Sequence, residues 1–270
     1  MVPILETINL EKSFGAVYAA RDVNIKIDAG EVLGVIGSNG AGKTTFVNMV
    51  TGYLKPSAGE IRYRGKNITG LPTRDITRLG ICRSFQIPQL FPELSVLDNV
   101  LIALTIANQK YPVLFAPAIN PALEQEAHVL LSKFKIDQYA DQDIATLPQG
   151  VRKLVDIALA TVSDPDLLFL DEPTSGVSAD EKMELMGILI DALRSSDTAV
   201  LFIEHDMEIV EAFSPRCVAF YEGTILADGP TSIVLENEKV REFVIGSEFH
   251  RAASKPDKSA PTSMEGGEQC

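Results

Sequence analysis

The sequence predicts an α/β fold in which a core of parallel strands carries an antiparallel β subdomain and a helical subdomain. Continuous apolar runs at residues 32–36, 167–170 and 199–203 are typical of strands buried on both faces of a parallel sheet. Residues 4–30 instead alternate apolar and polar side chains, which is the pattern of antiparallel strands. From residue 87 to about residue 160 the pattern becomes mostly helical, and this insert separates two halves of the core sheet.

The composition is that of a folded protein without a nucleic-acid-binding surface. The chain has 270 residues, of which 46% are hydrophobic and 23% charged, and this suits one sizeable core. Its net charge of −13 would repel phosphate backbones and anionic lipids. The strongest apolar segment, residues 96–107, contains Asp98 and is too short to span a membrane. Cys82, Cys217 and Cys270 lack metal or disulfide spacing, which favours an intracellular, reducing setting.

The first half of the chain combines short strands with helices. We expect Ser13-Phe14-Gly15 to form the turn between two antiparallel strands, and residues 59–65 to form another strand. Within the insert, residues 96–107 and 122–136 have helical periodicity, and prolines interrupt the stretch between them. The insert is therefore either a mobile, partner-facing subdomain or a set of helices packed on the core.

The last third of the chain returns to the core. Ser178 and Glu181 have the spacing of a capping box and predict the start of a helix. Residues 217–227 predict a hairpin, and a short helical segment should close the fold near Gly246. The expected apolar face of the helix after Ser178 consists of Met183, Met186, Leu189, Ile190 and Leu193.

A strand, a glycine-rich loop and a helix follow one another at residues 31–45, which fit the pattern G-x-x-x-x-G-K-[ST] at every fixed position. Such a loop lets backbone N–H groups converge on the phosphates of a nucleotide, and the helix adds its positive end. Lys43 can reach the β- and γ-phosphates, and the Thr44 hydroxyl can bind Mg²⁺. The candidate phosphate-binding residues are Gly37, Ser38, Asn39, Gly40, Ala41, Gly42, Lys43, Thr44 and Thr45. The sequence therefore predicts that the chain binds a nucleoside triphosphate.

Acidic residues and a histidine follow two of the buried strands, at the carboxyl ends where α/β folds bind their ligands. Asp171 is placed to hold Mg²⁺ through water, and Glu172 to polarise the water that attacks the γ-phosphate. His205 can reach the same phosphate, and its alternative is a structural or solvated histidine. Phe14 either stacks on a purine base or is simply a packed side chain.

The order of these motifs resembles that of ABC transporter nucleotide-binding domains. The matching motifs are the phosphate loop, Gln86, the segment Leu147-Pro148-Gln149-Gly150-Val151, the strand that ends in Asp171-Glu172-Pro173, and His205. The resemblance covers residues 4 to about 246 and implies the ABC ATPase fold. We therefore expect an ATP-binding cassette over residues 1–250 and a disordered tail over residues 251–270, where apolar side chains are few. Residues 84–104 and 227–246 look like the ATPase subunits of bacterial importers for branched-chain and other hydrophobic amino acids.

The resemblance implies a role for each matching residue. Phe14 would stack on the base, and His205 would steady the γ-phosphate. Glu172 would be the general base. Gln86 would contact Mg²⁺ and the attacking water, and would sense the membrane subunits through the helical insert. The implied cofactors are ATP and Mg²⁺, with Thr44, Gln86 and Asp171 as the residues around the metal.

The resemblance also implies partners. Two cassettes enclose two ATP molecules, each held by the phosphate loop of one protomer and the signature segment of the other. The translocation path would belong to transmembrane permease subunits, so the chain would act peripherally at the cytoplasmic face of the inner membrane. It would meet a substrate-binding protein only indirectly. The usual signature is Leu-Ser-Gly-Gly-Gln, but Pro148 and Gln149 replace its serine and first glycine, and Ser178 stands where an aspartate is common. Because these positions face the opposite protomer, we expect a heterodimer with a second ABC ATPase subunit rather than a homodimer.

Three other functions compete with amino-acid import. An exporter ATPase is the nearest alternative, because the cassette motifs do not distinguish import from export. A soluble ABC ATPase acting on ribosomes or DNA would need basic surfaces, which a net charge of −13 fits poorly. A phosphate-loop kinase would need an acceptor site and has no use for Gln86, the signature-like segment and His205.

Overall fold

The computed structural model describes residues 2–84, 90–108, 121–194 and 197–246. Gln86 and the tail over residues 251–270 lie outside the described residues.

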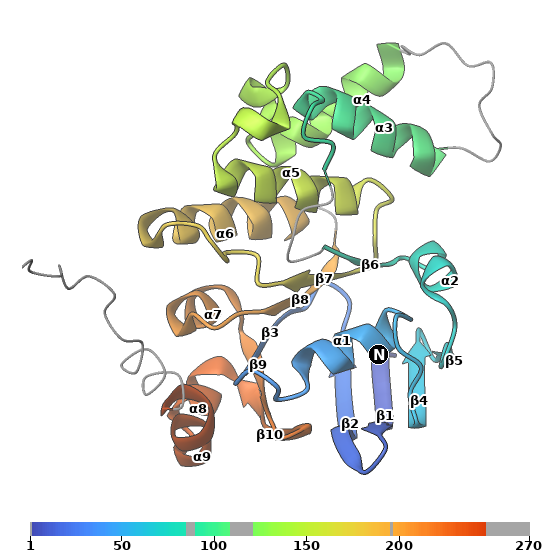
Figure 1. Cartoon of the computed structure of the whole chain (residues 1–270), viewed down its shortest axis with the longest axis vertical. Helices are drawn as coiled ribbons and strands as arrows, with labels where there is room; N and C mark the ends of the chain where they lie inside the picture. Colours follow the sequence, from blue (N-terminus) through green and yellow to red (C-terminus); the bar gives the residue numbers. More distant parts are fainter. Residues whose placement is uncertain (1, 85–89, 109–120, 195–196, 247–270) are drawn as a thin grey trace, which may run out of the picture.

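The core is a six-stranded sheet with the strand order β10-β9-β3-β8-β7-β6 (Figure 1). Neighbouring strands from β9 to β6 run parallel, and β10 is antiparallel to β9. All residues of β3, β7 and β8 are buried, which confirms the prediction from the continuous apolar runs. The strands are β3 (Val32–Gly37), β6 (Ile81–Arg83), β7 (Leu167–Asp171), β8 (Ala199–Ile203), β9 (Arg216–Tyr221) and β10 (Thr224–Pro230).

A second, antiparallel sheet has the strand order β2-β1-β4-β5. It confirms the strands expected from the period-2 pattern. Helix α1 (Lys43–Val50) joins this sheet to the core sheet through a shared apolar cluster. Within that cluster the rings of Phe46 in α1 and Phe220 in β9 lie 5.7 Å apart. The strands are β1 (Leu5–Phe14), β2 (Val17–Ile27), β4 (Ala58–Tyr63) and β5 (Lys66–Asn67).

The segment between β6 and β7 contributes three long helices, which occupy the top of the view in Figure 1. They are α3 (Val96–Asn108), α4 (Pro121–Lys133) and α5 (Gln149–Thr161). Helix α5 contacts both α3 and α4 on one side and α6 (Ala179–Arg194) on the other. One apolar cluster runs through all four helices and reaches the core sheet, so the segment and the sheet share a hydrophobic core.

Helix α6 begins directly after Ser178, as the capping-box pattern predicts. The Ser178 hydroxyl donates to Glu181 Oε2 at 2.6 Å. The expected apolar face is buried from Met186 onwards, but Met183 is 44% exposed, so its assignment to the core is wrong. Met183 lies near the start of the helix, before Leu185, where the buried residues of α6 begin.

The chain closes with short helical elements around β9 and β10, and these confirm the helical segment expected near Gly246. Around β9 and β10 these are α7 (Met207–Phe213), α8 (Thr231–Glu236), α9 (Glu238–Val240) and a π-helical turn, η3 (Arg241–Ile245). Other short elements lie earlier in the chain: α2 (Thr73–Arg78), η1 (Asp137–Tyr139) and η2 (Ile144–Thr146). In the part of the chain that the structure describes, no helix combines the length and apolar character needed to cross a membrane.

Candidate active site

The glycine-rich loop lies between the end of β3 and the start of α1. Gly37 has φ 154° and Gly42 has φ 103°, a region that side chains with a Cβ rarely enter. A Cβ at Gly37 would lie 2.6 Å from the Phe220 carbonyl oxygen, and one at Gly42 would lie 2.7 Å from that of Ala19. At Gly40, by contrast, a Cβ would meet nothing within 4 Å. The loop is therefore packed closely at both ends and open in the middle.

Lys43 and the start of α1 complete the loop. The buried Lys43 ammonium donates to the carbonyl oxygens of Gly37 and Ser38, the latter at 3.2 Å. Gly42 precedes the helix and offers no capping side chain, so the first N–H groups of α1 point into the loop. The neighbouring Thr44 is exposed. This arrangement places a cation beside the backbone N–H groups of a helix start, which is the chemistry of an anion site.

Asp171 ends β7 beside this loop and is buried. Its Oδ2 atom accepts a hydrogen bond from Arg83 Nη2 at 2.7 Å. Arg83 ends the adjacent strand β6, and its other terminal nitrogen donates to Asn48 Oδ1 of α1 at 2.6 Å. Arg83 therefore links the acidic end of β7 to the helix that follows the loop. Arg83 was not predicted as a site residue, because nothing in its local sequence indicates that β6 lies next to β7.

Glu172 and His205 come together from adjacent strand ends. Their closest side-chain atoms, Glu172 Oε1 and His205 Nε2, are 3.2 Å apart. Glu172 has φ 50°, an uncommon conformation for a residue with a Cβ. Its N–H donates to the Ile203 carbonyl at 3.0 Å, which continues the sheet pairing by one residue. The structure thus aligns the two residues that the sequence pattern placed at separate strand ends.

Two more ionisable groups contact this pair of residues. Glu204 is buried and accepts from both the N–H and the hydroxyl of Thr174, each at 2.8 Å. Burial raises the pKa of the Glu204 carboxyl, and the hydrogen bonds from Thr174 oppose that rise. Lys153 of α5 is also buried, and burial lowers the pKa of its ammonium, while nearby carboxylates, first among them Asp156, raise it.

Sequence reasoning named neither Glu204 nor Lys153 as a site residue. For Glu204, its position beside His205 at a strand end was an available signal. For Lys153, the only signal was its spacing of one helical turn from Gln149.

Phe14 stands at the end of β1 and is 56% exposed. The Lys12 ammonium lies 5.1 Å from the ring centroid. The ring is therefore outside the core and is available to a ligand, and its neighbour adds positive charge.

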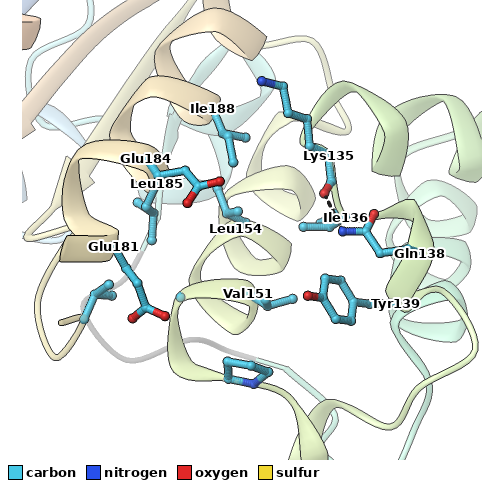
Figure 2. Close-up of a pocket in the computed structure, with 13 residues that line it drawn as sticks. Lys135, Ile136, Gln138, Tyr139, Val151, Leu154, Glu181, Glu184, Leu185 and Ile188 are labelled. Atoms are coloured by element: carbon cyan, nitrogen blue, oxygen red, sulfur yellow. Dashed lines mark hydrogen bonds between the residues drawn. The ribbon is translucent and has the colours of Figure 1, made fainter.

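The signature-like segment opens α5. Pro148 precedes the first turn with φ −55°, so proline is compatible with this helix start. Gln149 Nε2 donates to the Ser175 carbonyl of the same chain at 3.4 Å. Pro148, Gly150 and Val151 line a pocket of about 230 Å³. In Figure 2 Glu181, Glu184 and Leu185 of α6 face this pocket from one side, and Tyr139 faces it from the other.

The glycine loop, the acidic end of β7 and the histidine after β8 define the chain as a phosphate-loop nucleotide-binding protein. A protein-family model described as ABC transporter matches residues 20–175, and the chain belongs to this family.

Relatives of known function support the same family over nearly the whole chain. The high-affinity branched-chain amino acid transport ATP-binding protein BraF of Pseudomonas aeruginosa is 34% identical, and the match covers 90% of this chain and 98% of BraF. The corresponding LivG protein of Escherichia coli K12 is also 34% identical, with 90% and 98% covered. A crystal structure of the ADP conformation of an ATP-binding cassette from an ABC transporter matches with a TM-score of 0.80 and 30% identity, covering 90% of this chain and 98% of that one.

The chain therefore has the ABC ATPase cassette fold, as the sequence predicts. It is an ATP-binding subunit of an ABC transporter, related to branched-chain amino acid importers, and it hydrolyses ATP to drive transport.

Proposed function

We propose that this chain powers the import of branched-chain or other hydrophobic amino acids, as a peripheral subunit at the cytoplasmic face of the inner membrane. The observation that carries the proposed ATP hydrolysis is the pairing of Glu172 and His205 at the carboxyl ends of β7 and β8. The phosphate loop follows the parallel strand β3, so it lies at the same end of the sheet. The near-complete match to branched-chain transport ATPases supports the class of solute.

The phosphates of ATP would bind in the glycine loop. Backbone N–H groups of the loop and the start of α1 would donate to the phosphate oxygens. The Lys43 ammonium would move from the Gly37 and Ser38 carbonyls to the β- and γ-phosphates. The exposed ring of Phe14 would stack on the adenine. The residues that we assign to nucleotide binding are Phe14, Gly37, Ser38, Asn39, Gly40, Ala41, Gly42, Lys43, Thr44 and Thr45.

The same edge suits Mg²⁺, which prefers oxygen ligands and binds through one or two protein groups together with substrate phosphates. Thr44 offers a hydroxyl and Asp171 a carboxylate, and the hydrogen bond from Arg83 fixes the orientation of that carboxylate. Gln86 completes the proposed set. When bound, Mg²⁺ would offset the negative charge that develops on the transferred phosphate.

Hydrolysis would need a base and a group that steadies the γ-phosphate. Glu172 would accept the proton of the attacking water. His205 Nε2 lies 3.2 Å from that carboxylate, so the imidazole is next to the base, and with ATP bound it would donate its N–H to the γ-phosphate. Gln86 would contact the attacking water and transmit the state of the membrane subunits to the site.

Permease subunits would bind at the edge of the core sheet near β6. A pocket of about 250 Å³ lies there between the end of α1, α2 and the end of α5. Tyr53, which lines this pocket, and Leu79 at the end of α2 are exposed apolar side chains. Exposed apolar groups around a depression favour a protein interface. A substrate-binding protein would act on the permeases and not on this chain.

We also propose that the second cassette is a different ABC ATPase subunit. Pro148 lacks the hydroxyl and the N–H that a serine would offer to the partner's ATP. Gln149 is directed at Ser175 of its own chain. The nucleotide bound to the partner would therefore receive fewer contacts from this chain than a regular signature provides.

The complete transporter, purified from native membranes and reconstituted in vesicles, tests the proposed function through leucine uptake and ATP hydrolysis. Glu172→Gln should retain ATP binding and reduce hydrolysis by about 10²- to 10⁴-fold, because it removes only the base. Lys43→Ala should weaken nucleotide binding itself, and Glu236→Gln, at the exposed end of α8, is the control.

An unchanged rate in Glu172→Gln would show that the base is assigned wrongly. Co-purification with ribosomal proteins or a lipid exporter would contradict import.

A further inference from the structure

We propose that Gln149 and Lys153 are positioning residues that hold the loop after β7, and with it Glu172, in the geometry needed for hydrolysis. The inference rests on the proposed role of Glu172 as the base. The two side chains are one helical turn apart on α5 and therefore share one face of the helix. Lys153 Nζ donates to the Glu172 carbonyl at 3.3 Å, and Gln149 Nε2 donates to the Ser175 carbonyl at 3.4 Å. Together they hold the two ends of a single turn.

The backbone of Glu172 needs such support. Its φ of 50° is disfavoured for a residue with a Cβ and persists only where the surroundings fix it. The Ile203 carbonyl fixes the N–H of Glu172, whereas the Glu172 carbonyl accepts from the Ser175 N–H at 3.1 Å and from Lys153. The direction of the Glu172 side chain follows from these backbone contacts. Lys153 thus connects α5, the helix that begins with the signature-like segment, to the backbone of Glu172, the candidate base.

Lys153 is held in place by its surroundings. It is 3% exposed and lies among acidic side chains that offset its charge. These side chains are Asp156, Glu204, Glu172 and Asp171. A buried ammonium that is fixed in this way can hold a carbonyl with little freedom of movement.

The loop is built to accept Gln149. Gly176 has φ 77°, and a Cβ at that position would lie 2.1 Å from Gln149 Nε2. The glutamine amide therefore occupies the space that any residue larger than glycine at position 176 would need. This contact explains why a bulky residue fits the signature position: Gln149 braces its own loop. Because α5 begins at the surface proposed to meet the partner, any shift of this helix would act on Glu172 through the two contacts.

The first test removes each donor while keeping the length of the side chain. Lys153→Met and Gln149→Met are placed separately in the complete transporter. Affinity for a fluorescent ATP analogue should stay within about twofold, because the phosphate loop is untouched. Single-turnover hydrolysis should fall on the order of tenfold to a hundredfold for Lys153→Met, and less for the exposed Gln149→Met. The proposal would be overturned if a variant lost affinity for the ATP analogue and hydrolysis rate by equal factors.

Matched controls separate the hydrogen bond from general effects of charge. Lys182→Met removes another lysine of the same acidic region, one that pairs with Asp206 at 2.9 Å. Gln138→Met removes a side-chain amide that donates to the Lys135 carbonyl at 3.1 Å. Both controls should hydrolyse ATP at nearly the unmutated rate. A loss in Lys182→Met as large as that in Lys153→Met would show that charge, and not the contact with Glu172, is responsible.

Combination with Glu172→Gln gives the decisive result. If Lys153 acts by positioning the base, Lys153→Met should cause no further loss once the base is gone. A further loss of the same factor would contradict the positioning role. Full activity of Glu172→Gln alone would instead refute the proposed function of Glu172, so the two failures are distinguishable. Gln149→Met supports the same comparison if Lys153→Met does not fold.

Discussion

At the residue scale, the carboxyl edge of the core sheet concentrates ionisable groups in unequal environments. Asp171 is held by an arginine, Glu172 faces a histidine, and Glu204 is buried against Thr174. Burial raises the pKa of the Glu204 carboxyl. Neighbouring carboxylates can thus take different roles, because solvation and partners differ at each position.

The direction of the pKa shift of Glu204 predicts how the stability of the fold depends on pH. A folded-state pKa above the unfolded value means that the contribution of Glu204 is fully present below its ordinary pKa and is lost as the pH rises through the folded value. Ionised Glu204 therefore costs stability at neutral pH, and Glu204→Gln keeps an acceptor for Thr174 without the charge. The variant should melt above the unmutated protein at pH 8, and the difference should disappear near about pH 4. Glu211→Gln, on the exposed face of α7, is the control; a Glu204→Gln variant that melts lower at pH 8 would contradict the argument.

The candidate site was predictable from the sequence wherever a residue stands at a fixed distance from a motif. The glycine loop, Asp171, Glu172 and His205 all follow buried strands directly, so their shared edge could be inferred. Arg83 and Lys153 could not be named, because their partners are 88 and 19 positions away in the chain. Such contacts depend on which strands and helices become neighbours, and local periodicity carries no information about that.

At the scale of elements, the two sheets are joined by a polar contact as well as by α1. The Tyr63 hydroxyl at the end of β4 donates to Asp166, just before β7, and Arg64 Nη2 pairs with the same carboxylate at 2.6 Å. Burial and the Asp166 carboxylate raise the pKa of Tyr63 to about 12. The tyrosine thus anchors the antiparallel sheet to the strand that ends in Asp171.

Tyr63→Phe should lower the free energy of unfolding by about 1–3 kcal/mol at pH 8, because the hydrogen bond to a carboxylate is lost. The contribution of the hydroxyl is fully present below the ordinary tyrosine pKa and is lost as the pH rises through about 12. The difference between variant and unmutated protein should therefore shrink above about pH 10. Urea unfolding at several pH values measures it. Tyr18→Phe, at an exposed position of β2, serves as the control, and a constant difference up to pH 12 would contradict the assignment.

Elements with a strong period were predictable to within a few residues, including β3, β7, β8, α3 and α6. Periodicity did not show where an element leaves the core, and Met183 is the example: it has the spacing of the buried face, yet it is exposed near the start of α6. Helix periodicity reports a face, and only the tertiary structure decides how far along the helix that face is covered.

At the scale of the whole molecule, the proposed machinery has two parts, one for the nucleotide of this chain and one for that of its partner. The phosphate loop, Asp171 and Glu172 form one edge of the core sheet, while the signature-like segment opens α5 beside α6. If the proposed assignments hold, the chain would contribute fully to its own nucleotide and poorly to that of its partner. The order of the motifs was enough to predict a phosphate loop for this chain's nucleotide and a signature-like segment for the partner's. That Gln149 donates to Ser175 of its own chain became apparent only from the structure.

The last prediction concerns the asymmetry of the assembled transporter. If the partner carries a regular signature, the site built on this chain's Lys43, Asp171 and Glu172 is complete, whereas the site on the partner's phosphate loop faces Pro148 and Gln149. Glu172→Gln should then abolish most turnover, on the order of a hundredfold or more, while the equivalent substitution in the partner should cost far less. ATP hydrolysis by the complete transporter, with each glutamate changed separately, measures both losses. The alternative is that the backbone donors near Gly150 and the start of α5 suffice for the second site. Equal losses from the two substitutions would favour that alternative, and a fully active transporter containing only this ATPase chain would rule out the heterodimer.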